Sequence, residues 1–411
     1  MKKILIIGAG AQGGPCASIL TRDKDVSEII LADLNLELAN RIKDRLKSDK
    51  ISVVQVDAAK IEDIERAARG VDIVINLTLC RFNENIMKAA LRCKAHYVDS
   101  AFADPIWTQF LENQPIEIGN QYKNAGLTAL VGCGGAPGLV NVMARYICDK
   151  LDVVDEIHIK VGDRLLEESG EVIKIWEPKW CPEIALGDYV DDPIVFEDGE
   201  YKKHPPFSGI EQYDFPAPVG RVLIGYHSHE EPVTLPRFIG KGVKYVGFKY
   251  PIDPIAAAFV KMGFASADNL EVKGVSVAPR DVLLKLVHPP VDTFFTENEH
   301  TSNQPPKSAH PYLLEIKGQK SGESQTYKIW WPSSLVTDAR DRREIYNKFG
   351  TTNIAVALPI VAGAKICMEG KAERGLIAPE CIDPMEFLKE MANTGWSVKF
   401  HEMLYREVSV Q

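Results

Sequence analysis

The first 33 residues of the chain constrain its fold more than any other stretch. Residues 4–7 form an apolar run typical of a short buried strand, and a helical pattern begins near residue 16. The turn between them is rich in glycine, and a second β-like run over residues 28–32 ends at Asp33. Strand, glycine turn, helix, strand and acid follow one another in the order that a dinucleotide-binding fold requires.

The glycine turn contains residues with distinct mechanical uses. Gly8 permits a tight turn off the strand, Gly10 lets a diphosphate approach the backbone, and Gly13 lets the helix lie close to the sheet. Ala11 and Gln12 complete the turn, whose exposed N–H groups and helix dipole favour a phosphate. We expect these five residues to bind the cofactor. The alternative is an α/β domain that binds nothing here, because glycine turns also recur by chance.

Asp33 indicates which cofactor is bound. It lies 20 residues beyond Gly13, at the end of the second strand, where a carboxylate accepts hydrogen bonds from ribose hydroxyls. The same carboxylate repels a 2′-phosphate, and no arginine follows it directly. The pattern therefore favours NAD over NADP.

Length and charge exclude several classes of protein. The 411 residues have room for two or three domains, and 45% of them are hydrophobic. A net charge of −9 argues against a nucleic-acid surface, and no apolar run approaches the ~20 residues of a membrane span. The chain enters a strand directly, which leaves no room for a signal peptide, and its eight cysteines form no CxxC pair. We expect a cytoplasmic protein with reduced cysteines and no membrane or nucleic-acid partner.

Strands alternate with helices over the first 130 or so residues, which predicts a doubly wound parallel sheet of the Rossmann type. The expected strands are residues 4–7, 28–32, 51–56, 71–75, 96–99 and 127–131. A single long helical segment is expected at 107–124. In such a sheet the ligand lies over the carboxyl ends of the strands, so residues that follow strands should share one rim.

Besides the glycine turn, this rim is predicted to carry Asp57, Ala58, Asn76, Leu77, Thr78 and Asp99. We expect Asp57 and Ala58 to lie at the adenine. Asn76, Leu77 and Thr78 are expected to line the route to the nicotinamide. Asp57 and Asp99 have an alternative use as caps of the helices that follow. A second glycine-rich turn, 132–138, opens the helix predicted at 139–150 and either presents N–H groups to a ligand or is a plain tight turn.

The pattern changes after residue 156. Alternating strands punctuated by proline and glycine predict an antiparallel sheet, with a hairpin at 312–316 and 326–331 and a surface loop over 291–310. An apolar helix over 351–369 is predicted to pack back on the first domain. The expected division is a dinucleotide-binding domain of residues 1–135 and 345–411 with an inserted α+β substrate and dimerisation domain, 136–344.

The densest group of residues suited to catalysis is the segment 226–232, with His229 and Glu230 as the predicted catalytic residues. Histidine titrates near neutral pH and suits proton transfer, and a neighbouring carboxylate orients it or binds an ammonium group. His227 and His229 would point the same way from an extended chain, yet no metal is predicted because few further ligands lie nearby. A polar loop or a dimer contact is the alternative. Arg221 and Arg237 are candidate partners of a substrate carboxylate.

Four stretches together resemble the saccharopine dehydrogenase family, and its lysine 6-dehydrogenase branch in particular. They are the glycine-rich start with Asp57, GAPGLVN at 135–141, VAPRDVL at 277–283, and 351–379, which ends in ERGLIAP. The likeness is strong over the first 150 residues and after about 270. The middle, 165–238, departs from the family, and we expect the substrate to be recognised there.

The resemblance implies a nicotinamide-dependent reaction at an amine-bearing carbon of an amino acid, and a homodimer built through the second domain. The leading hypothesis is an NAD-dependent amino-acid or polyamine-type dehydrogenase that acts on a CH–NH2 or CH–NH group. The alternative is a non-catalytic NAD-binding regulatory or scaffold protein, because the fold alone does not determine function.

Overall fold

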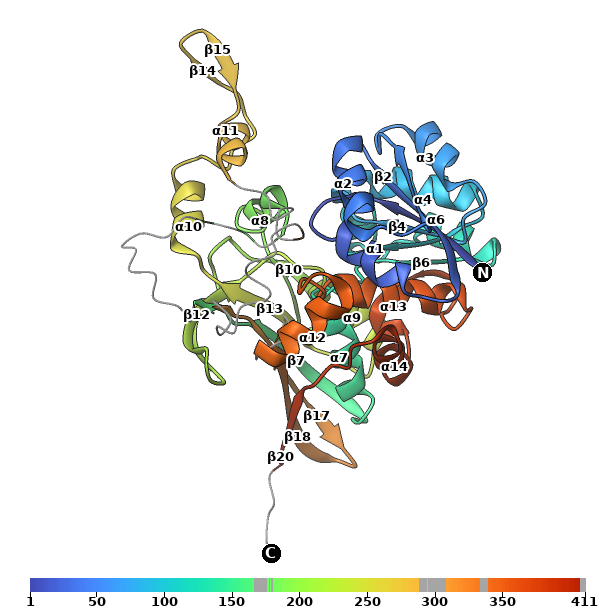
Figure 1. Ribbon diagram of the computed structural model, residues 1–411. Helices are drawn as coiled ribbons and strands as arrows, with labels where there is room; N and C mark the ends of the chain where they lie inside the picture. Colours follow the sequence, from blue (N-terminus) through green and yellow to red (C-terminus); the bar gives the residue numbers. More distant parts are fainter. Residues whose placement is uncertain are drawn as a thin grey trace, which may run out of the picture.

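The computed structural model describes residues 1–165, 176, 178, 180–287, 294, 308–332 and 339–406. Two large sheets, joined by helices, make up the body of the molecule (Figure 1). Most of the loop predicted at 291–310 lies outside the described residues. Among the helices that the structure describes, none has the length and apolar character needed to cross a bilayer.

The first sheet has seven parallel strands in the order β19-β6-β5-β4-β1-β2-β3. Their bounds are β1 Lys2–Ile7, β2 Val26–Asp33, β3 Ile51–Gln55, β4 Ile73–Asn76, β5 His96–Asp99, β6 Thr128–Leu130 and β19 Gly375–Ile377. The predicted Rossmann-type sheet is confirmed. Its seventh strand, β19, was not predicted, because it comes from the far end of the chain.

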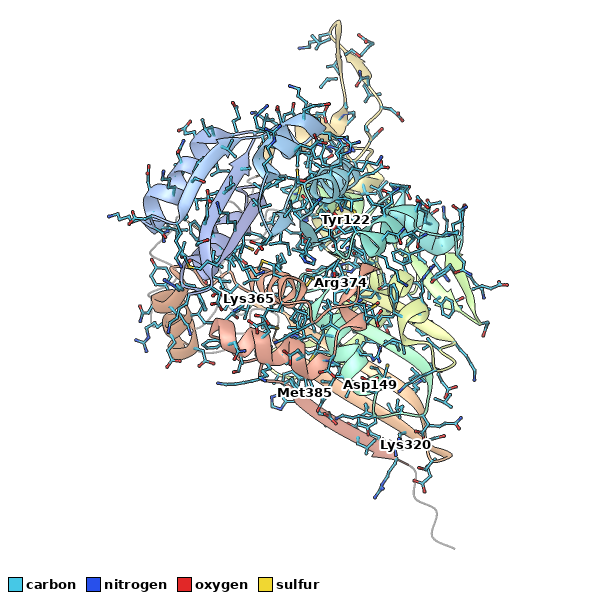
Figure 2. All side chains as sticks on the ribbon, turned by 90° about the vertical axis from the view of Figure 1, so that its right-hand side faces the viewer. Tyr122, Asp149, Lys320, Lys365, Arg374 and Met385 are labelled. Carbon is cyan, nitrogen blue, oxygen red and sulfur yellow. The ribbon has the colours of Figure 1, made fainter. Side chains whose placement is uncertain are left out.

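Helices cover both faces of this sheet, because its strands are apolar on both sides. In β1, Ile4 and Ile6 pack into one core cluster while Leu5 and Ile7 pack into another. The first face carries α1 Gly13–Thr21, α2 Leu36–Leu46 and α13 Ala357–Met368, and the second carries α3 Ile61–Ala68, α4 Asn83–Arg92 and α6 Glu117–Asn124. On α13, Lys365 (labelled in Figure 2) pairs with Asp23 and Glu390.

Two helical predictions for the first domain were incomplete. No helix was predicted at α2, which is mostly polar and buries only Ala39 and Ile42. The predicted helix 107–124 is two helices, α5 Ile106–Leu111 and α6, with Pro115 in the segment between them. Proline cannot donate the hydrogen bond that would continue a helix, so the chain turns there.

The second sheet has nine strands. Seven follow the order β10-β9-β13-β7-β17-β18-β20, and β12 joins β11 to β13. The bounds are β7 Val153–Val161, β9 Ile194–Glu197, β10 Glu200–Lys203, β11 Glu211–Phe215, β12 Gly220–Tyr226, β13 Tyr245–Pro251, β17 Pro311–Lys320, β18 Glu323–Pro332 and β20 His401–Arg406. The predicted hairpin is β17 and β18. The sheet is mixed rather than antiparallel, because β13 and β7 run parallel after a long crossover.

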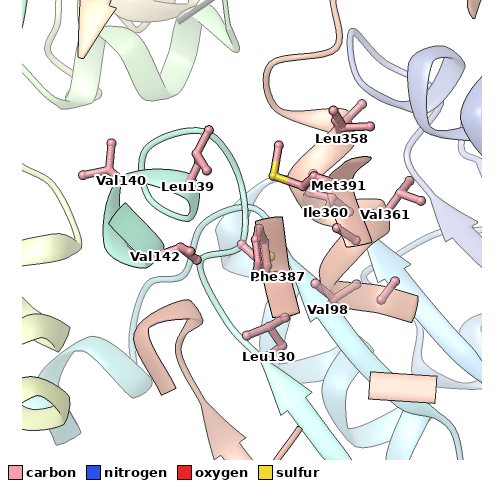
Figure 3. Packing of buried hydrophobic residues seen from close by; sticks show 14 of the residues in the cluster. Val98, Leu130, Leu139, Val140, Val142, Leu358, Ile360, Val361, Phe387 and Met391 are labelled. Atoms are coloured by element: carbon pink, nitrogen blue, oxygen red, sulfur yellow. The ribbon is translucent and has the colours of Figure 1, made fainter. Parts of the chain in front are cut away.

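A shared core joins the two sheets. Helices α7 Leu139–Cys148 and α9 Glu231–Ile239 pack between them, and α14 Pro384–Thr394 lies against α13 and α7. Figure 3 shows side chains of β5, β6, α7, α13 and α14 meeting in one cluster. The predicted packing of the late apolar helix on the first domain is confirmed by the contacts of α13 with α1 and β5.

The last part of the chain contributes to both sheets, since β19 joins the first and β20 the second. The domain boundaries at 135 and 345 stay a prediction. The other described elements are η1 Cys80–Phe82, β8 Arg164–Leu165, α8 Pro182–Gly187, β16 Ser308–Ala309, α12 Ala339–Phe349 and η3 Pro379–Cys381. An arm made of α10 Pro254–Lys261, β14 Leu270–Val272, β15 Val275–Val277 and α11 Pro279–Leu286 projects from the body (Figure 1).

Candidate active site

The glycine turn has the geometry of a diphosphate cradle. Gly8 has φ +108°, and a Cβ added there would lie 2.7 Å from the carbonyl oxygen of Leu77. A Cβ on Gly13 would overlap the carbonyl oxygen of Gly8, whereas nothing lies within 4 Å of a Cβ added to Gly10. The turn is therefore tightly packed at both ends and open in the middle, where a diphosphate needs to approach the backbone.

Gln12 supplies a second sign that this turn fits a ligand. It precedes α1, and its Oε1 is buried without a hydrogen-bond partner among the residues that the structure describes. Buried polar atoms are normally paired, so an orphaned acceptor beside a helix N-terminus fits a group that binds there. Ala11 forms the tip of the turn, and its carbonyl oxygen accepts a hydrogen bond of 3.5 Å from Asn353 Nδ2.

Asp33 lies at the end of β2, beside the glycine turn. Its carboxylate accepts hydrogen bonds from the backbone N–H of Ala9 at 2.6 Å and of Asn35 at 2.7 Å. The side chain is only partly buried, and each oxygen keeps a second lone pair. Asp33 thus anchors the turn, and its predicted bond to a ribose stays a prediction.

Asp57 and Ala58 follow β3 on the same rim. Asp57 accepts a hydrogen bond of 3.0 Å from the Ala59 N–H and pairs with Lys60 at 3.2 Å. It does not cap α3, whose N-cap is Lys60. Ala58 is buried. The structure brings both residues to the predicted edge, and their role at the adenine stays a prediction.

Asn76 and Thr78 are tied to each other at the end of β4. Asn76 Nδ2 donates to Asn83 Oδ1 at 2.8 Å and to the Tyr97 hydroxyl at 2.9 Å, and its Oδ1 accepts from the Thr78 hydroxyl at 2.7 Å. Asn76 is therefore held by protein partners below the rim. Leu77 and Thr78 are partly exposed, and Leu77 lies against Gly8.

Asp99 belongs to the same buried network. It accepts hydrogen bonds from the Gly132 N–H at 2.7 Å, the Tyr97 hydroxyl at 2.8 Å and Asn83 Nδ2 at 3.1 Å. Burial raises the pKa of Asp99 to about 8, against the opposing effect of the Gly132 and Tyr97 hydrogen bonds. Asp99 thus connects the end of β5 to Gly132 after β6 and to Asn83 of α4, and contact with a cofactor stays a prediction.

The second glycine turn closes on itself. Gly134 N–H donates to the Pro137 carbonyl at 2.7 Å, and the N–H groups of Leu139 and Val140 donate to Gly134 and Gly135 carbonyls. The first amides of α7 are consequently occupied. Of the two readings that the sequence left open, the plain tight turn describes this segment.

His229 and its neighbours form a compact ionisable cluster just before α9. His229 Nδ1 contacts Glu231 Oε2 and lies 3.5 Å from Glu230 Oε2. Glu231 is fully buried, and its Oε1 is unpartnered within the described ranges. The imidazole stacks on Phe248 of β13 with 3.9 Å between ring centroids and 6° between planes. The ring is thus held on one face by an aromatic side chain and at one nitrogen by a carboxylate.

The cluster keeps a proton at neutral pH. Burial alone would lower the pKa of His229, but Glu231, Glu230 and Asp188 outweigh it and raise this pKa to about 9. Burial raises the pKa of Glu230 to about 7, with His229 opposing the shift and Glu231 and Asp188 adding to it. At neutral pH His229 is therefore protonated and can act as an acid, whereas Glu230 is present in both its protonated and its ionised form.

The cluster faces the carboxyl edge of the first sheet. Glu230 Oε1 accepts a hydrogen bond of 3.3 Å from the N–H of Phe102, which follows β5. The thiol of Cys80, just after β4, has its pKa raised by burial and then by Glu230, Asp99 and Asp188. The predicted catalytic pair and the predicted cofactor rim therefore meet between the two sheets.

Several residues of this site were not predicted from the sequence. Asp188 follows α8, and Glu380 is fully buried in η3, where Asn141 Nδ2 donates to its Oε2 at 3.0 Å. Burial raises the pKa of Glu380 to about 7, although hydrogen bonds from Thr234 and Asn141 oppose the shift. The only available signals were that Asn141 and Glu380 lie in or next to family-like stretches.

Two predicted carboxylate partners lie elsewhere, so that expectation was wrong. Arg221 forms a pair with Asp214 at 2.7 Å on the exposed hairpin of β11 and β12. Arg237 lies over the ring of Phe110 at 5.3 Å and donates to Asn113 Oδ1. Both guanidinium groups already have partners of their own.

Family models match almost the whole chain. Residues 4–130 match the saccharopine dehydrogenase NADP binding domain, and residues 134–396 match the saccharopine dehydrogenase C-terminal domain. The chain belongs to the saccharopine dehydrogenase family. This confirms the resemblance to the family, whereas the lysine 6-dehydrogenase branch stays a prediction. The first model is named for NADP, so the predicted preference for NAD stays a prediction.

Two relatives match this chain over nearly the whole length of both chains. A carboxyaminopropylagmatine dehydrogenase of Synechocystis sp. is 24% identical over 98% of both chains. A carboxynorspermidine synthase of Vibrio cholerae is 25% identical over 96% of both chains.

Solved structures share the fold. Saccharopine dehydrogenase of Saccharomyces cerevisiae matches with a TM-score of 0.69 and 15% identity, over 98% of this chain and 100% of that chain. Homospermidine synthase of Legionella pneumophila, solved with NAD, matches with a TM-score of 0.68 and 13% identity, over 98% of this chain and 91% of that chain. At these identities the matches bear on the fold alone.

Proposed function

We propose that this chain is an NAD(P)-dependent dehydrogenase acting on the C–N bond of an amine, with a polyamine-like or amino-acid substrate. The observation that carries the proposal is the meeting of an acid–histidine cluster with the carboxyl edge that bears the glycine turn. Carboxylates in a buried site attract a cationic amine. The names of the two full-length relatives favour a secondary amine formed from an amine and a carbonyl compound.

The residues of the cluster suit the proton transfers of such a reaction. Glu230, with its pKa near 7, takes a proton from the substrate ammonium so that the free amine attacks the carbonyl carbon. His229 carries a proton at neutral pH and donates it as the hydroxyl leaves as water, which produces an iminium. Glu231 holds the ring through Nδ1 during both steps. A bound nicotinamide supplies the hydride that completes the secondary amine, and oxidation follows the reverse course.

The turn residues Gly8, Gly10, Ala11, Gln12 and Gly13 would hold the cofactor's diphosphate. We further propose that the cofactor is NAD, since the carboxylate of Asp33 beside the turn disfavours a 2′-phosphate. Asp57 and Ala58 would flank the adenine, with Leu77 and Thr78 nearer the nicotinamide. Asn76 and Asp99 would support this rim from below.

The test is a turnover panel. Lysine, diamines and agmatine are each offered with NAD, and then with NADH and an amino-acid semialdehyde, while NADH absorbance is followed. We expect turnover with at least one amine, and lysine with NAD alone tests the lysine 6-dehydrogenase-like activity. Bound cofactor without turnover across the panel would instead identify a non-catalytic NAD-binding protein.

A further inference from the structure

A second histidine–carboxylate pair lies beside the catalytic cluster. Strand β13 presents Phe248 and Tyr250 at alternate positions, and the two histidines of the segment between β12 and α9 stack on them. His229 covers Phe248, while His227 covers Tyr250 with 5.1 Å between centroids and 27° between planes. One aromatic strand face thus carries two imidazoles, each next to a carboxylate.

The second pair has an unfilled hydrogen-bonding position. His227 is 4% exposed, and its Nε2 has no hydrogen-bond partner in the part of the chain that the structure describes. This nitrogen lies 3.6 Å from Asp188 Oδ2, too far for a direct hydrogen bond. An ammonium group placed between the two atoms can donate one N–H to each. The proposed mechanism does not use this position.

Aromatic rings pack around His227 itself. Tyr189 meets the His227 ring edge-on, with 5.0 Å between centroids and 79° between planes. Its hydroxyl donates to the Pro251 carbonyl at 3.0 Å and accepts from the Asp253 N–H at 3.3 Å, so the ring is fixed in place. Trp180 packs edge-on against Tyr250 at 5.7 Å. Aromatic faces next to a carboxylate favour an alkylammonium group.

We propose that Asp188, His227, Tyr189 and Tyr250 form a second cation subsite, which binds the distal ammonium of a diamine or polyamine. The inference rests on the proposed function, because the reacting nitrogen is taken to lie at Glu230 and His229. Positions two residues apart on a strand are roughly 6.6 Å apart. This spacing is comparable with the distance between the nitrogens of extended butane-1,4-diamine, so the site selects amines by a second charge at that separation.

Calorimetry on the full chain, with and without NADH, tests the subsite. The ligands are propane-1,3-diamine, butane-1,4-diamine, pentane-1,5-diamine and the monoamine butylamine. We expect butane-1,4-diamine to bind about tenfold or more tightly than butylamine, as for a charged hydrogen bond. Asp188→Asn should remove most of this advantage. Asp192→Asn, which removes the same charge from an exposed neighbour, should leave it unchanged.

A second variant distinguishes loss of the subsite from misfolding. His227→Phe keeps the stack on Tyr250 but removes Nε2, and it should lower the diamine advantage without lowering the melting temperature. Equal affinity for diamine and butylamine, or an advantage that survives Asp188→Asn, overturns the subsite even if the turnover panel succeeds. A diamine advantage that depends on Asp188, found in a protein without turnover, supports the subsite and contradicts the proposed function.

Discussion

The cofactor rim and the acid–histidine cluster are built in different ways. On the rim, Asp33 accepts a hydrogen bond from the N–H of Ala9, 24 positions away, within one strand–turn–helix–strand unit. In the cluster, Glu230 accepts a hydrogen bond from Phe102 across 128 positions. In the core nearby, Asn141 donates to Glu380 across 239 positions. The rim depends on backbone shape and local contacts, whereas the cluster exists only when both sheets are folded and packed. Variants of the two regions should therefore fail in different ways.

The largest effect is expected at His229. His229→Ala removes the proposed acid and should lower kcat by about 10²- to 10⁴-fold, the usual contribution of acid–base catalysis. NADH binding should stay within a factor of about two to three, because the glycine turn is untouched. Steady-state kinetics and NADH fluorescence titration measure the two quantities. His204→Ala, which breaks a pair with Glu197 elsewhere in the second sheet, is the control. An unimpaired rate would remove His229 from the mechanism.

The pH dependence of kcat/KM should report both members of the catalytic pair. Activity should rise as Glu230 loses its proton, with a pKa of about 7, and fall as His229 loses its own, with a pKa of about 9. The optimum should lie between these values, although the two apparent pKa values belong to the coupled pair. Glu230→Gln should lower the rate and abolish the acidic limb. If that limb persists in the variant, another group is the base.

Alanine substitutions at Gly13 and Gly10 should distinguish an effect on protein stability from an effect on cofactor binding. A Cβ at Gly13 overlaps the Gly8 carbonyl, so Gly13→Ala should destabilise the protein by about 1–3 kcal/mol, as overpacking does. A Cβ at Gly10 meets nothing, so Gly10→Ala should leave the melting temperature unchanged and weaken cofactor binding. Thermal unfolding with and without NADH distinguishes them. Equal cofactor affinity in Gly10→Ala and the parent would contradict the diphosphate cradle.

Asp33 tests the choice of cofactor. Asp33→Ala removes a charged acceptor and should weaken NAD binding by about 1–3 kcal/mol. Binding of NADP should weaken less or improve, because the repulsive charge is lost. Calorimetry with both cofactors measures the ratio. Since Asp33 also anchors the Ala9 N–H, Asp33→Asn, which keeps an acceptor, is the matched variant. Tighter binding of NADP than of NAD by the parent protein would show that our reading of Asp33 is wrong.

The same contrast explains what the sequence could predict. Gly8, Gly10, Gly13 and Asp33 are readable because their roles follow from backbone geometry within 33 consecutive residues. His229 and Glu230 were found by residue type alone, and their burial and proton affinities depend on Phe102, Asp188 and Phe248. Strand β19 and the parallel pair of β13 and β7 come from pairings between distant segments, which local periodicity does not encode.

The smallest effect is expected at a contact that crosses between the two regions. Arg81 of η1 pairs with Glu183 of α8 at 2.8 Å, and α8 leads directly to Asp188. Arg66 and Asp63 form a pair at 2.7 Å, of similar exposure, within α3. Exposed pairs contribute about 0–1 kcal/mol, so Arg81→Ala and Arg66→Ala should lower stability equally little. Only Arg81→Ala should raise KM for a diamine, because it removes a contact that holds α8, the helix directly before Asp188 of the proposed subsite. Unchanged KM would mean that α8 keeps its position without this contact.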